Sequence, residues 1–572
     1  MEIIFKLIRV GMLVLSCLGW IDYLTSEKKI KIEFSIFVLL NGIGSIMFLA
    51  GILNILKLAV FLIWSIGGVL FIRIAIKRRR INNYFTVGTV ALFAFLCGAF
   101  LLLYGTKLIN YDNFSHWAVV AKELLLNNRF PNFQDSNIMF QSYPPGSAAY
   151  IYYICKITGI YSEWMMMYAQ ATMILGNLAV LYVFVRKRFW NIFLATITIV
   201  FVLCSNVRLT DIYVDTLLMS VAAGGLLFCM YYKNEMQKRY VYLIGVLVNL
   251  VGIKNSGIFF VLIISVYIAT FSLNIKEDWK KLLVIIGAPI SSLILWQSHV
   301  KIVFESGMST KHSMSAENLQ NIWSEKSGET VIEIMRAFCE RVFSFGNGIF
   351  YLLFGLLIIH FIYKAIKQKS FMKQKEVWFI VGTYVAYMLS LFAMYLFSMP
   401  TEEAVRVAAF ERYHRTIIDF LVMTNVPYIF KIKMKKWCFA TLILSIVIEY
   451  FTISPHMEYL TRVNWKQSKR YEYEMVIEKN KIPNDSSYIF LQKDEDAGYS
   501  YYFFRYYFQT TKVAVFNEKQ LNNQFEDIIV QWKNYDYLII LDRTRASDRF
   551  VKDISGKELY TQVINLRQYK TK

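Results

Sequence analysis

The sequence predicts a polytopic α-helical membrane protein that ends in a small α/β domain. Of its 572 residues, 56% are hydrophobic and 17% are aromatic, and the mean hydropathy is +0.41. A helix needs about 20 apolar residues to cross a bilayer, and the chain holds about 12 to 14 apolar segments. From about residue 458 these segments stop, and charged residues alternate with short apolar stretches. Such a composition excludes a soluble globular protein for the larger part of the chain.

The basic residues fall in short runs between the apolar segments. The formal net charge is +21, yet no single domain collects it. Clusters of Lys and Arg beside membrane segments mark cytoplasmic loops, and their spread argues against a nucleic-acid-binding surface. The sequence therefore indicates a multi-pass protein of the cell membrane, with these runs on the inside: 77–80, 186–188, 233–239, 276–281, 364–375 and 431–436.

With the basic runs placed inside, the sequence predicts two membrane parts, followed by a third, C-terminal part. Residues 1–83 hold the first spans, residues 84–457 form a transmembrane core, and that core carries outer loops at 105–163 and 301–346. Two of the apolar segments are short for a bilayer, so one or both are expected to be tilted or broken. The spans expected in the core are 84–104, 164–185, 190–206, 214–232, the short pair 240–252 and 257–271, 282–300, 349–363, 377–399, 416–430 and 437–454.

Residues 458–572 are predicted to form an extracytoplasmic α/β accessory domain. Residues 487–491, 512–516 and 537–541 have the pattern of short buried strands, and helical stretches separate them. Strands that alternate with helices favour a mostly parallel sheet. The region has no glycine-rich phosphate loop, so a lid or accessory role is favoured over a nucleotide site.

The seven cysteines indicate neither a disulfide framework nor a zinc site. Almost all of them lie within or beside apolar segments, and no CxxC spacing occurs. The histidines are scattered and show no metal-ligand spacing. The sequence thus indicates no metal site and no cofactor.

A polar stretch with a carboxylate follows the span that ends near residue 104. It reads YDNFSHWAVVAKELL, in which Asp112 and His116 precede residues with the apolar spacing of an interfacial helix. Two roles are open for each residue. Asp112 is either a catalytic carboxylate or the cap of that helix, and His116 either carries a proton or packs at the interface. A turn comes next, and its prolines break regular structure. It is formed by Tyr143, Pro144, Pro145 and Gly146.

Three further charged groups fall at the outer ends of predicted spans. Asp211 and Asp215 stand in RLTDIYVDTLL, Lys254 stands in GIKNSG, and residues 411–415 read ERYHR. Charges at membrane mouths are costly and mark functional sites. Carboxylates with cations suit a reaction in which a base activates a hydroxyl while cations hold an anionic leaving group. Helix capping by the aspartates, snorkelling by the lysine and headgroup contacts by the arginines stay open as alternatives.

Taken in this order, the motifs resemble the GT-C superfamily of membrane glycosyltransferases. The likeness is strongest to the bacterial branch with lipid A aminoarabinose transferase and the protein O-mannosyltransferases. Members carry an acidic motif after an early span, then an interfacial helix and a Pro-Pro turn. Asp112 matches the catalytic aspartate of that motif, while Asn113 stands where a second acid is usual and His116 where tyrosine is common. SYPPG is similar to the family's Lys-Pro-Pro-Leu segment without its lysine.

The later motifs extend the resemblance over about residues 84–430. VDTLL is similar to the acidic start of a middle span, so Asp215 corresponds to the second family carboxylate. GIKNSG resembles a Thr-Lys-Gly-Pro turn, which implies that Lys254 contacts a lipid phosphate. ERYH is similar to a late Arg-Tyr motif and adds Arg412 and Tyr413 to that phosphate site, with Arg415 counted beside them. The missing second acid leaves the use of a divalent metal open.

The resemblance implies a transferase that takes a sugar from a polyprenyl-phosphate-linked donor. The acceptor would be a glycan, a lipid or a protein outside the cytoplasm, and transfer would generally invert the anomeric carbon. Asp112 would take the acceptor proton while the phosphate leaves against Lys254 and Arg412, and Asp215 would orient acceptor or sugar. Two other interpretations stay open. One is a polysaccharide polymerase or ligase, and the other is a flippase or secondary transporter, although the sequence shows no paired repeat typical of transporters.

The topology is testable by cysteine labelling. In a background without the native cysteines, single cysteines at Asn132, Ser327 and Asp494 should react with an impermeant thiol reagent in intact cells. A cysteine at Gln368 should react only after permeabilisation, because it lies in a basic loop expected inside. The reverse pattern would contradict the extracytoplasmic placement of both outer loops and of the C-terminal domain.

Overall fold

The computed structural model describes residues 1–76, 84–135, 137–185, 188–304, 316–343, 350–368, 375–430 and 436–570. The basic run 77–80 lies outside them, as do residues 186–187, 369–374 and 431–435 of other runs and residues 305–315 and 344–346 of the second outer loop. The chain divides into two compact units. The membrane unit comprises Met1–Gly105, Ala121–Asn132 and Phe140–Arg462. The α/β unit comprises Thr106–Val120, Phe133–Met139 and Val463–Lys572.

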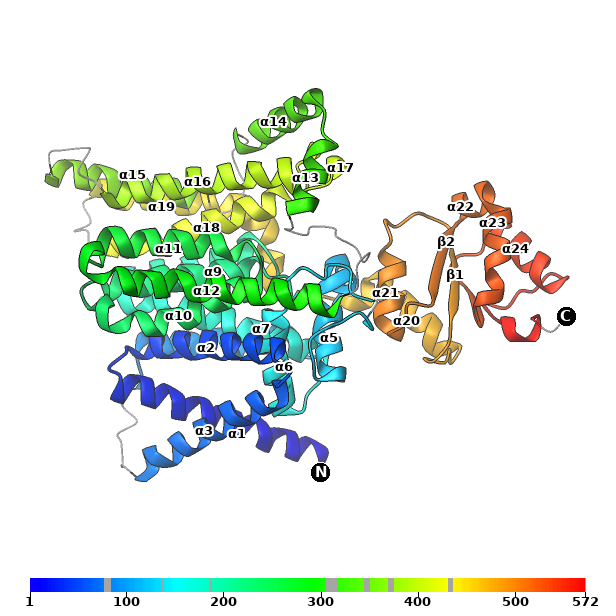
Figure 1. Cartoon of the computed structure of the whole chain (residues 1–572), viewed down its shortest axis with the longest axis horizontal. Coiled ribbons are helices and arrows are strands. Elements are labelled where there is room, and N and C mark those ends of the chain that lie inside the picture. The colour runs from blue at the N-terminus through cyan, green and yellow to red at the C-terminus, as the bar shows by residue number, and fades with distance from the viewer. Residues whose placement is uncertain are drawn as a thin grey trace. The chain divides into compact units, whose positions relative to one another are not determined.

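The membrane unit is a bundle of long helices (Figure 1). Every apolar segment predicted as a span falls on a helix. The α-helices up to the end of the bundle are α1 (Glu2–Asp22), α2 (Ile32–Ile52), α3 (Leu56–Ile76), α4 (Val87–Leu103), α5 (Ala118–Asn127), α6 (Gly146–Thr158), α7 (Glu163–Leu178), α8 (Phe189–Ser205), α9 (Asp215–Tyr231), α10 (Met236–Ile253), α11 (Gly257–Phe271), α12 (Ile275–Val303), α13 (Ala316–Ser324), α14 (Gly328–Phe343), α15 (Phe350–Gln368), α16 (Lys375–Phe397), α17 (Thr401–Val405), α18 (Phe410–Phe430) and α19 (Lys436–Ile453).

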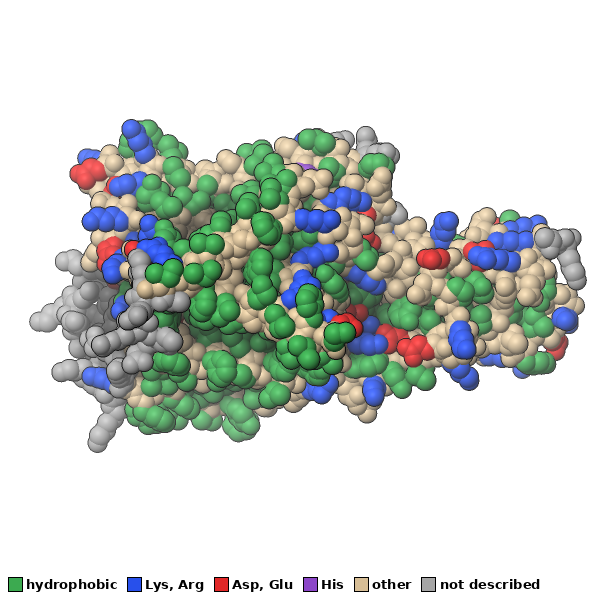
Figure 2. All heavy atoms as spheres, turned by 90° about the horizontal axis from the view of Figure 1, so that it is seen from below, with side chains coloured by type: hydrophobic (Ala, Val, Ile, Leu, Met, Phe, Trp, Pro, Cys, Tyr) green, Lys and Arg blue, Asp and Glu red, His purple; other side chains and the backbone are tan. Residues whose placement is uncertain are grey.

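The length and composition of these helices confirm a polytopic membrane protein. Within the described ranges, seven helices are long and apolar enough to cross a membrane, and α9 with α10, bent by 77°, would make an eighth span. Three shorter apolar helices are α4, α8 and α11. The helix break expected at residues 253–256 is present, since α10 ends at Ile253 and α11 begins at Gly257. Hydrophobic side chains cover much of the surface of this unit, as a lipid environment requires (Figure 2).

Hydrogen bonds between buried amide side chains fix the packing of four helices in the bundle. Asn41 of α2 donates to Asn177 of α7 (2.8 Å), and Asn249 of α10 donates to Asn41 (2.9 Å). Asn177 donates in turn to Ser220 of α9 (3.1 Å). A buried amide without a partner is costly, so this chain of bonds fixes how α2, α7, α9 and α10 pack.

The α/β unit contains a four-stranded sheet in the order β2-β1-β3-β4. Strands β1 (Tyr488–Gln492), β2 (Val513–Asn517) and β3 (Tyr537–Ile540) run parallel, and β4 (Val563–Asn565) pairs antiparallel with β3. The helices are α20 (Lys469–Lys479), α21 (Tyr499–Phe508), α22 (Glu518–Asn523), α23 (Phe525–Ile529) and α24 (Arg545–Ser555). The predicted small, mostly parallel sheet is confirmed. Strand β4 has only three residues, too few for a strand pattern to be recognised in the sequence.

A segment from early in the chain, residues 106–120, packs with C-terminal residues of the α/β unit. Phe114 is 1% exposed, and the rings of Tyr499, Phe503 and Tyr506 lie 5.3 to 5.6 Å from its own. Buried Arg470 donates to the Leu108 carbonyl at 2.5 Å and also bonds to Glu474 within α20. The sequence predicts residues 106–120 as part of an outer loop of the core, because local patterns do not encode a contact made more than 350 residues away.

We expect Arg470→Gln to loosen residues 106–120 in the full-length protein. The change removes a charged donor from the Leu108 carbonyl, and such bonds contribute about 1.5–3 kcal/mol. Tryptic cleavage after Lys107 should therefore become faster. Arg543→Gln is the matched control, because its ion pair with Asp548 is solvent-exposed and contributes about 0–1 kcal/mol. Equal cleavage rates in both variants would contradict this role of Arg470.

Candidate functional site

A buried carboxylate at the start of α9 is the centre of a charged cluster in the membrane unit. Asp215 is the first residue of that helix and is 3% exposed. Its Oδ1 accepts a hydrogen bond from Lys254 Nζ at 2.8 Å, and its Oδ2 lies 3.3 Å from Arg412 Nε. A carboxylate buried this deeply needs such partners. The two ion pairs therefore compensate the charge of Asp215 in this buried position.

Lys254 reaches this carboxylate because the chain leaves helical geometry there. It terminates α10 with an extended backbone, and Gly257 N–H then bonds back to its carbonyl at 2.8 Å. A Cβ at Gly257 would lie 2.1 Å from the Leu250 carbonyl oxygen, so only glycine permits α11 to start so close to the end of α10. Gly257, the second glycine of GIKNSG, is thus required for the helix packing that positions Lys254.

Arg412 and Tyr413 lie in the first turn of α18, and aromatic rings flank the cations. Lys254 Nζ is 4.9 Å from the centre of the Tyr413 ring. The guanidinium of Arg412 is 5.6 Å from the rings of both Tyr413 and Tyr213. Tyr387 of α16 donates to the Tyr413 carbonyl at 3.0 Å. Contacts between a cation and an aromatic ring stabilise the cation by about 0.5–2 kcal/mol. They therefore help to hold Lys254 and Arg412 in place.

The cluster carries a surplus positive charge. Asp215 neutralises one of the two cations, which leaves a formal charge of +1. The Lys254 side chain is 11% exposed and that of Arg412 is 28% exposed, so Arg412 is the more accessible of the two. An anion is the ligand that such a site favours, and desolvation strengthens the attraction.

A cavity of about 330 Å³ opens beside Lys254. Its polar end includes Asn255, Tyr387 and Tyr413 as well as Tyr143 of the predicted Pro-Pro turn. Most of its other lining side chains are apolar and come from α11, α16 and the residues just after α16: Ile258, Phe259, Leu262, Leu391, Met394 and Met399. The cavity therefore combines a cation with a mostly apolar wall.

The SYPPG turn packs directly against the turn that carries Lys254. Asn255 Nδ2 donates to the Ser142 carbonyl at 3.2 Å, and Trp296 Nε1 donates to the same oxygen at 3.0 Å. A Cβ at Gly146 would lie 2.5 Å from the Gly252 carbonyl oxygen. The two motifs, more than 100 residues apart in the sequence, thus form one structural element next to the cavity.

Asp112 and His116 belong to the α/β unit. Asp112 precedes a short π-helical turn, Asn113–Trp117, and its side chain makes no capping hydrogen bond with that turn. His116 is 3% exposed with its ring centre 4.7 Å from that of Trp117, and burial lowers its pKa to about 3. The imidazole is therefore neutral at physiological pH, which favours packing over proton transfer for His116.

The remaining charged residues of the predicted motifs make other contacts. Arg415 donates to the Ser205 carbonyl at 2.9 Å and lies 3.8 Å from Glu411. Sequence reasoning missed Tyr213 and Tyr387 at the cluster. Tyr213 lies between the two aspartates of RLTDIYVDTLL and could have been noticed, whereas nothing in the sequence around Tyr387 distinguishes it from a packing residue. In the part of the chain that the structure describes, no group of three or more His, Cys, Asp or Glu residues is arranged to hold a metal ion.

Comparison with known proteins identifies the fold. No family model and no curated protein matches the sequence. ArnT from Cupriavidus metallidurans bound to undecaprenyl phosphate has a similar structure, with a TM-score of 0.51 at 11% identity over 84% of this chain and 97% of ArnT. ArnT in the apo state gives 0.47 at 12% identity, over 79% of this chain and 92% of ArnT. The archaeal oligosaccharyltransferase AglB from Archaeoglobus fulgidus, in complex with an inhibitory peptide and a dolichol-phosphate, gives 0.44 at 10% identity, over 79% and 69%.

The first of these matches shows that the chain has the same fold as ArnT. The fold predicted from the order of the motifs is confirmed. At this level of identity the likeness concerns the fold, and the chemistry of the chain is argued from its own residues.

Proposed function

We propose that this protein is a membrane glycosyltransferase with a polyprenyl-phosphate-linked sugar as donor. The observation that carries the proposal is the surplus positive charge of the cluster formed by Lys254, Arg412 and Asp215, in which Lys254 lines a mostly apolar cavity. A phosphate attached to a long hydrocarbon chain has the same two parts, an anion and an apolar tail. The fold shared with ArnT, which was observed bound to undecaprenyl phosphate, supports this choice of donor.

The proposed reaction is a direct displacement at the anomeric carbon of the donor sugar. An acceptor hydroxyl forms the new C–O bond, and the bond from that carbon to the phosphate oxygen breaks. The phosphate takes the electron pair and leaves against Lys254 and Arg412, where preorganised cations stabilise the developing charge. Asp112 takes the proton of the hydroxyl as general base. The configuration at the anomeric carbon is inverted.

Other residues of the cluster have supporting roles in this proposal. Asp215 holds both cations in position through its ion pairs, in addition to the orientation of acceptor or sugar expected from the resemblance. Tyr413 and Tyr143 line the cavity and would contact the lipid phosphate or its first isoprene units. His116 is buried and neutral, so we assign it to positioning the segment that carries Asp112.

The acceptor is proposed to be an envelope glycan, lipid or protein on the extracytoplasmic side. The orientation follows from the basic runs, which the positive-inside rule places in the cytoplasm. The α/β unit is proposed to govern acceptor access, and it also contains the segment with the proposed base. A comparison of the envelope glycans of cells with and without the gene would identify the acceptor and the sugar.

Asp112→Asn should abolish transfer without loss of expression or membrane insertion. The amide keeps the shape of the side chain but cannot take the proton, and loss of a general base costs about 10²–10⁴-fold in rate. The measurement is transfer from a polyprenyl-phosphate sugar by the purified protein. Asp494→Asn changes an exposed acid of the same unit and serves as the control, with activity close to wild type. Near-normal activity of Asp112→Asn would reject Asp112 as the base.

Lys254→Met and Arg412→Gln should each raise the KM for the lipid donor. A charge-assisted bond contributes about 1.5–3 kcal/mol, which corresponds to about a 10- to 100-fold change. The KM for the acceptor should change much less. Arg406→Gln removes an exposed cation that directly follows α17 and should leave both constants unchanged. If neither cluster variant alters donor use, the cations do not bind the lipid phosphate.

A further inference from the structure

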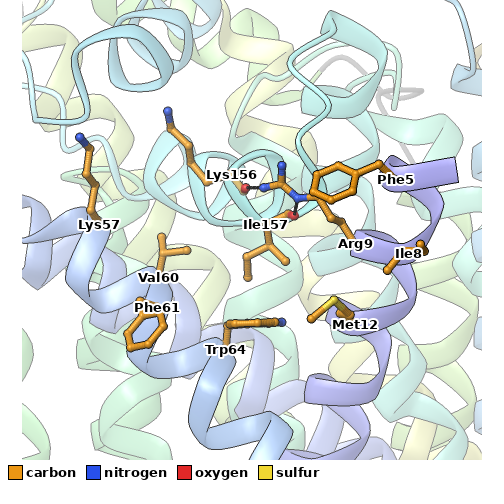
Figure 3. A pocket seen from close by; sticks show the side chains of 10 residues that line it. All are labelled: Phe5, Ile8, Arg9, Met12, Lys57, Val60, Phe61, Trp64, Lys156 and Ile157. Atoms are coloured by element: carbon orange, nitrogen blue, oxygen red, sulfur yellow. Dashed lines mark hydrogen bonds between the residues drawn. The ribbon is translucent and has the colours of Figure 1, made fainter. Parts of the chain in front are cut away.

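A second cavity lies at the N-terminal side of the membrane unit, between α1, α3 and the end of α6 (Figure 3). Its volume is about 430 Å³, within the range of ligand pockets in proteins. Most of its wall is hydrophobic, with the side chains of Phe5, Ile8, Met12, Val60, Phe61 and Trp64. Phe5 and Phe61 are 60% and 58% exposed, so the cavity is open on the lipid-facing surface of the unit.

Three cations line this cavity, one from each of its helices. Arg9 comes from α1, Lys57 is the second residue of α3, and Lys156 lies in the last turn of α6. Figure 3 shows the amines of Lys57 and Lys156 extending to the same side of the cavity. Lys57 and Lys156 lie near helix ends, a position at which lysines reach lipid headgroups, and Arg9 lies two turns into α1.

Only part of this charge is compensated within the described residues. Arg9 donates through Nε to the Ile157 carbonyl (2.6 Å) and through Nη2 to the Lys156 carbonyl. Lys156 Nζ donates to the Leu125 carbonyl at 3.0 Å. Over the ranges that the structure describes, no carboxylate forms an ion pair with any of the three cations, and the cavity holds a formal charge of +3.

The two lysines also repel each other. Burial, and next the charge of Lys57, lower the pKa of Lys156. Two ammonium groups held together without an acid are unfavourable unless an anion binds between them. The cavity contains no acidic side chain that could serve as a base or bind a cation. Its chemistry is therefore that of a binding site for an amphipathic anion.

We propose that this cavity binds one anionic phospholipid of the bilayer. The phosphate lies between Lys57 and Lys156, within reach of Arg9, and one acyl chain lies along Phe61 and Trp64 between α1 and α3. Anionic headgroups are attracted to clustered Lys and Arg at the membrane surface. The lipid acts as a structural ligand that neutralises the cation cluster and joins α1 and α3 to α6. This inference does not rest on the transferase activity.

The test is lipid retention by the full-length protein, measured by native mass spectrometry from nanodiscs. The probes are phosphatidylglycerol and, for comparison, neutral phosphatidylcholine. The wild type should retain one phosphatidylglycerol. Lys57→Gln and Lys156→Gln should each weaken its retention about fivefold, the expected effect of one surface cation. Lys6→Gln should have no effect, because Lys6 is on the same helix but pairs with Glu2 outside the cavity.

A second variant tests the acyl chain rather than the charge. Val60→Trp fills the cavity from α3 and should abolish retention of phosphatidylglycerol while all three cations remain. Equal retention in the wild type and all variants, or equal retention of phosphatidylcholine, would overturn the proposal. Undecaprenyl phosphate is the competing probe. If Lys57→Gln loses that lipid and keeps phosphatidylglycerol, the occupant is a carrier lipid and the phospholipid assignment is wrong.

Discussion

The ion pairs of Asp215 with Lys254 and Arg412 are the interaction on which the organisation of the membrane unit's polar end depends. They join the start of α9, the break between α10 and α11, and the start of α18 at one buried point. Removing either cation would leave a buried carboxylate with less compensation, which is costly in a medium of low dielectric. The same pairs leave one positive charge in excess. The contact that stabilises the fold therefore also creates the preference for an anion.

The position of the cations is set by backbone constraints as much as by charge. A helix break inside a membrane protein is tolerated where neighbouring groups satisfy the freed backbone. Here the break holds Lys254, Gly257 lets α11 begin against the end of α10, and the SYPPG turn packs on the same spot through Gly146. The amide chain from Asn41 to Ser220 fixes the two helices that carry Asp215 and Lys254. In this chain, the short motif GIKNSG, bounded by glycines within an apolar stretch, thus marks the position of the charged cluster.

Hydropathy alone predicted where the helices lie, and charge at span ends predicted Asp215, Lys254 and Arg412, because both signals are local. Placing every basic run on one side predicted that these charges share the outer side of the membrane, and the structure shows that they form one cluster. Contacts between distant segments could not be predicted in this way. Tyr387 looks like any aromatic residue of a membrane helix, and its role depends on α16 packing near α18. Residues 106–120 resemble an ordinary outer loop, while their packing partners lie in α20 and α21.

That last contact changes what the C-terminal region can be. The sequence favoured an accessory lid, separable from the chemistry. In the α/β unit, however, Phe114 sits among the rings of α21, and Tyr499 donates to the Ile109 carbonyl at 2.9 Å. The proposed base lies between these anchors, so its position depends on C-terminal residues. A chain that ends after residue 454 would keep the cation cluster and its cavity but lose the packing that orders the segment around Asp112. In the proposed mechanism, the residues for donor binding and for proton removal therefore belong to different units, and a C-terminal change is expected to affect the rate of transfer before it affects the affinity for the lipid donor.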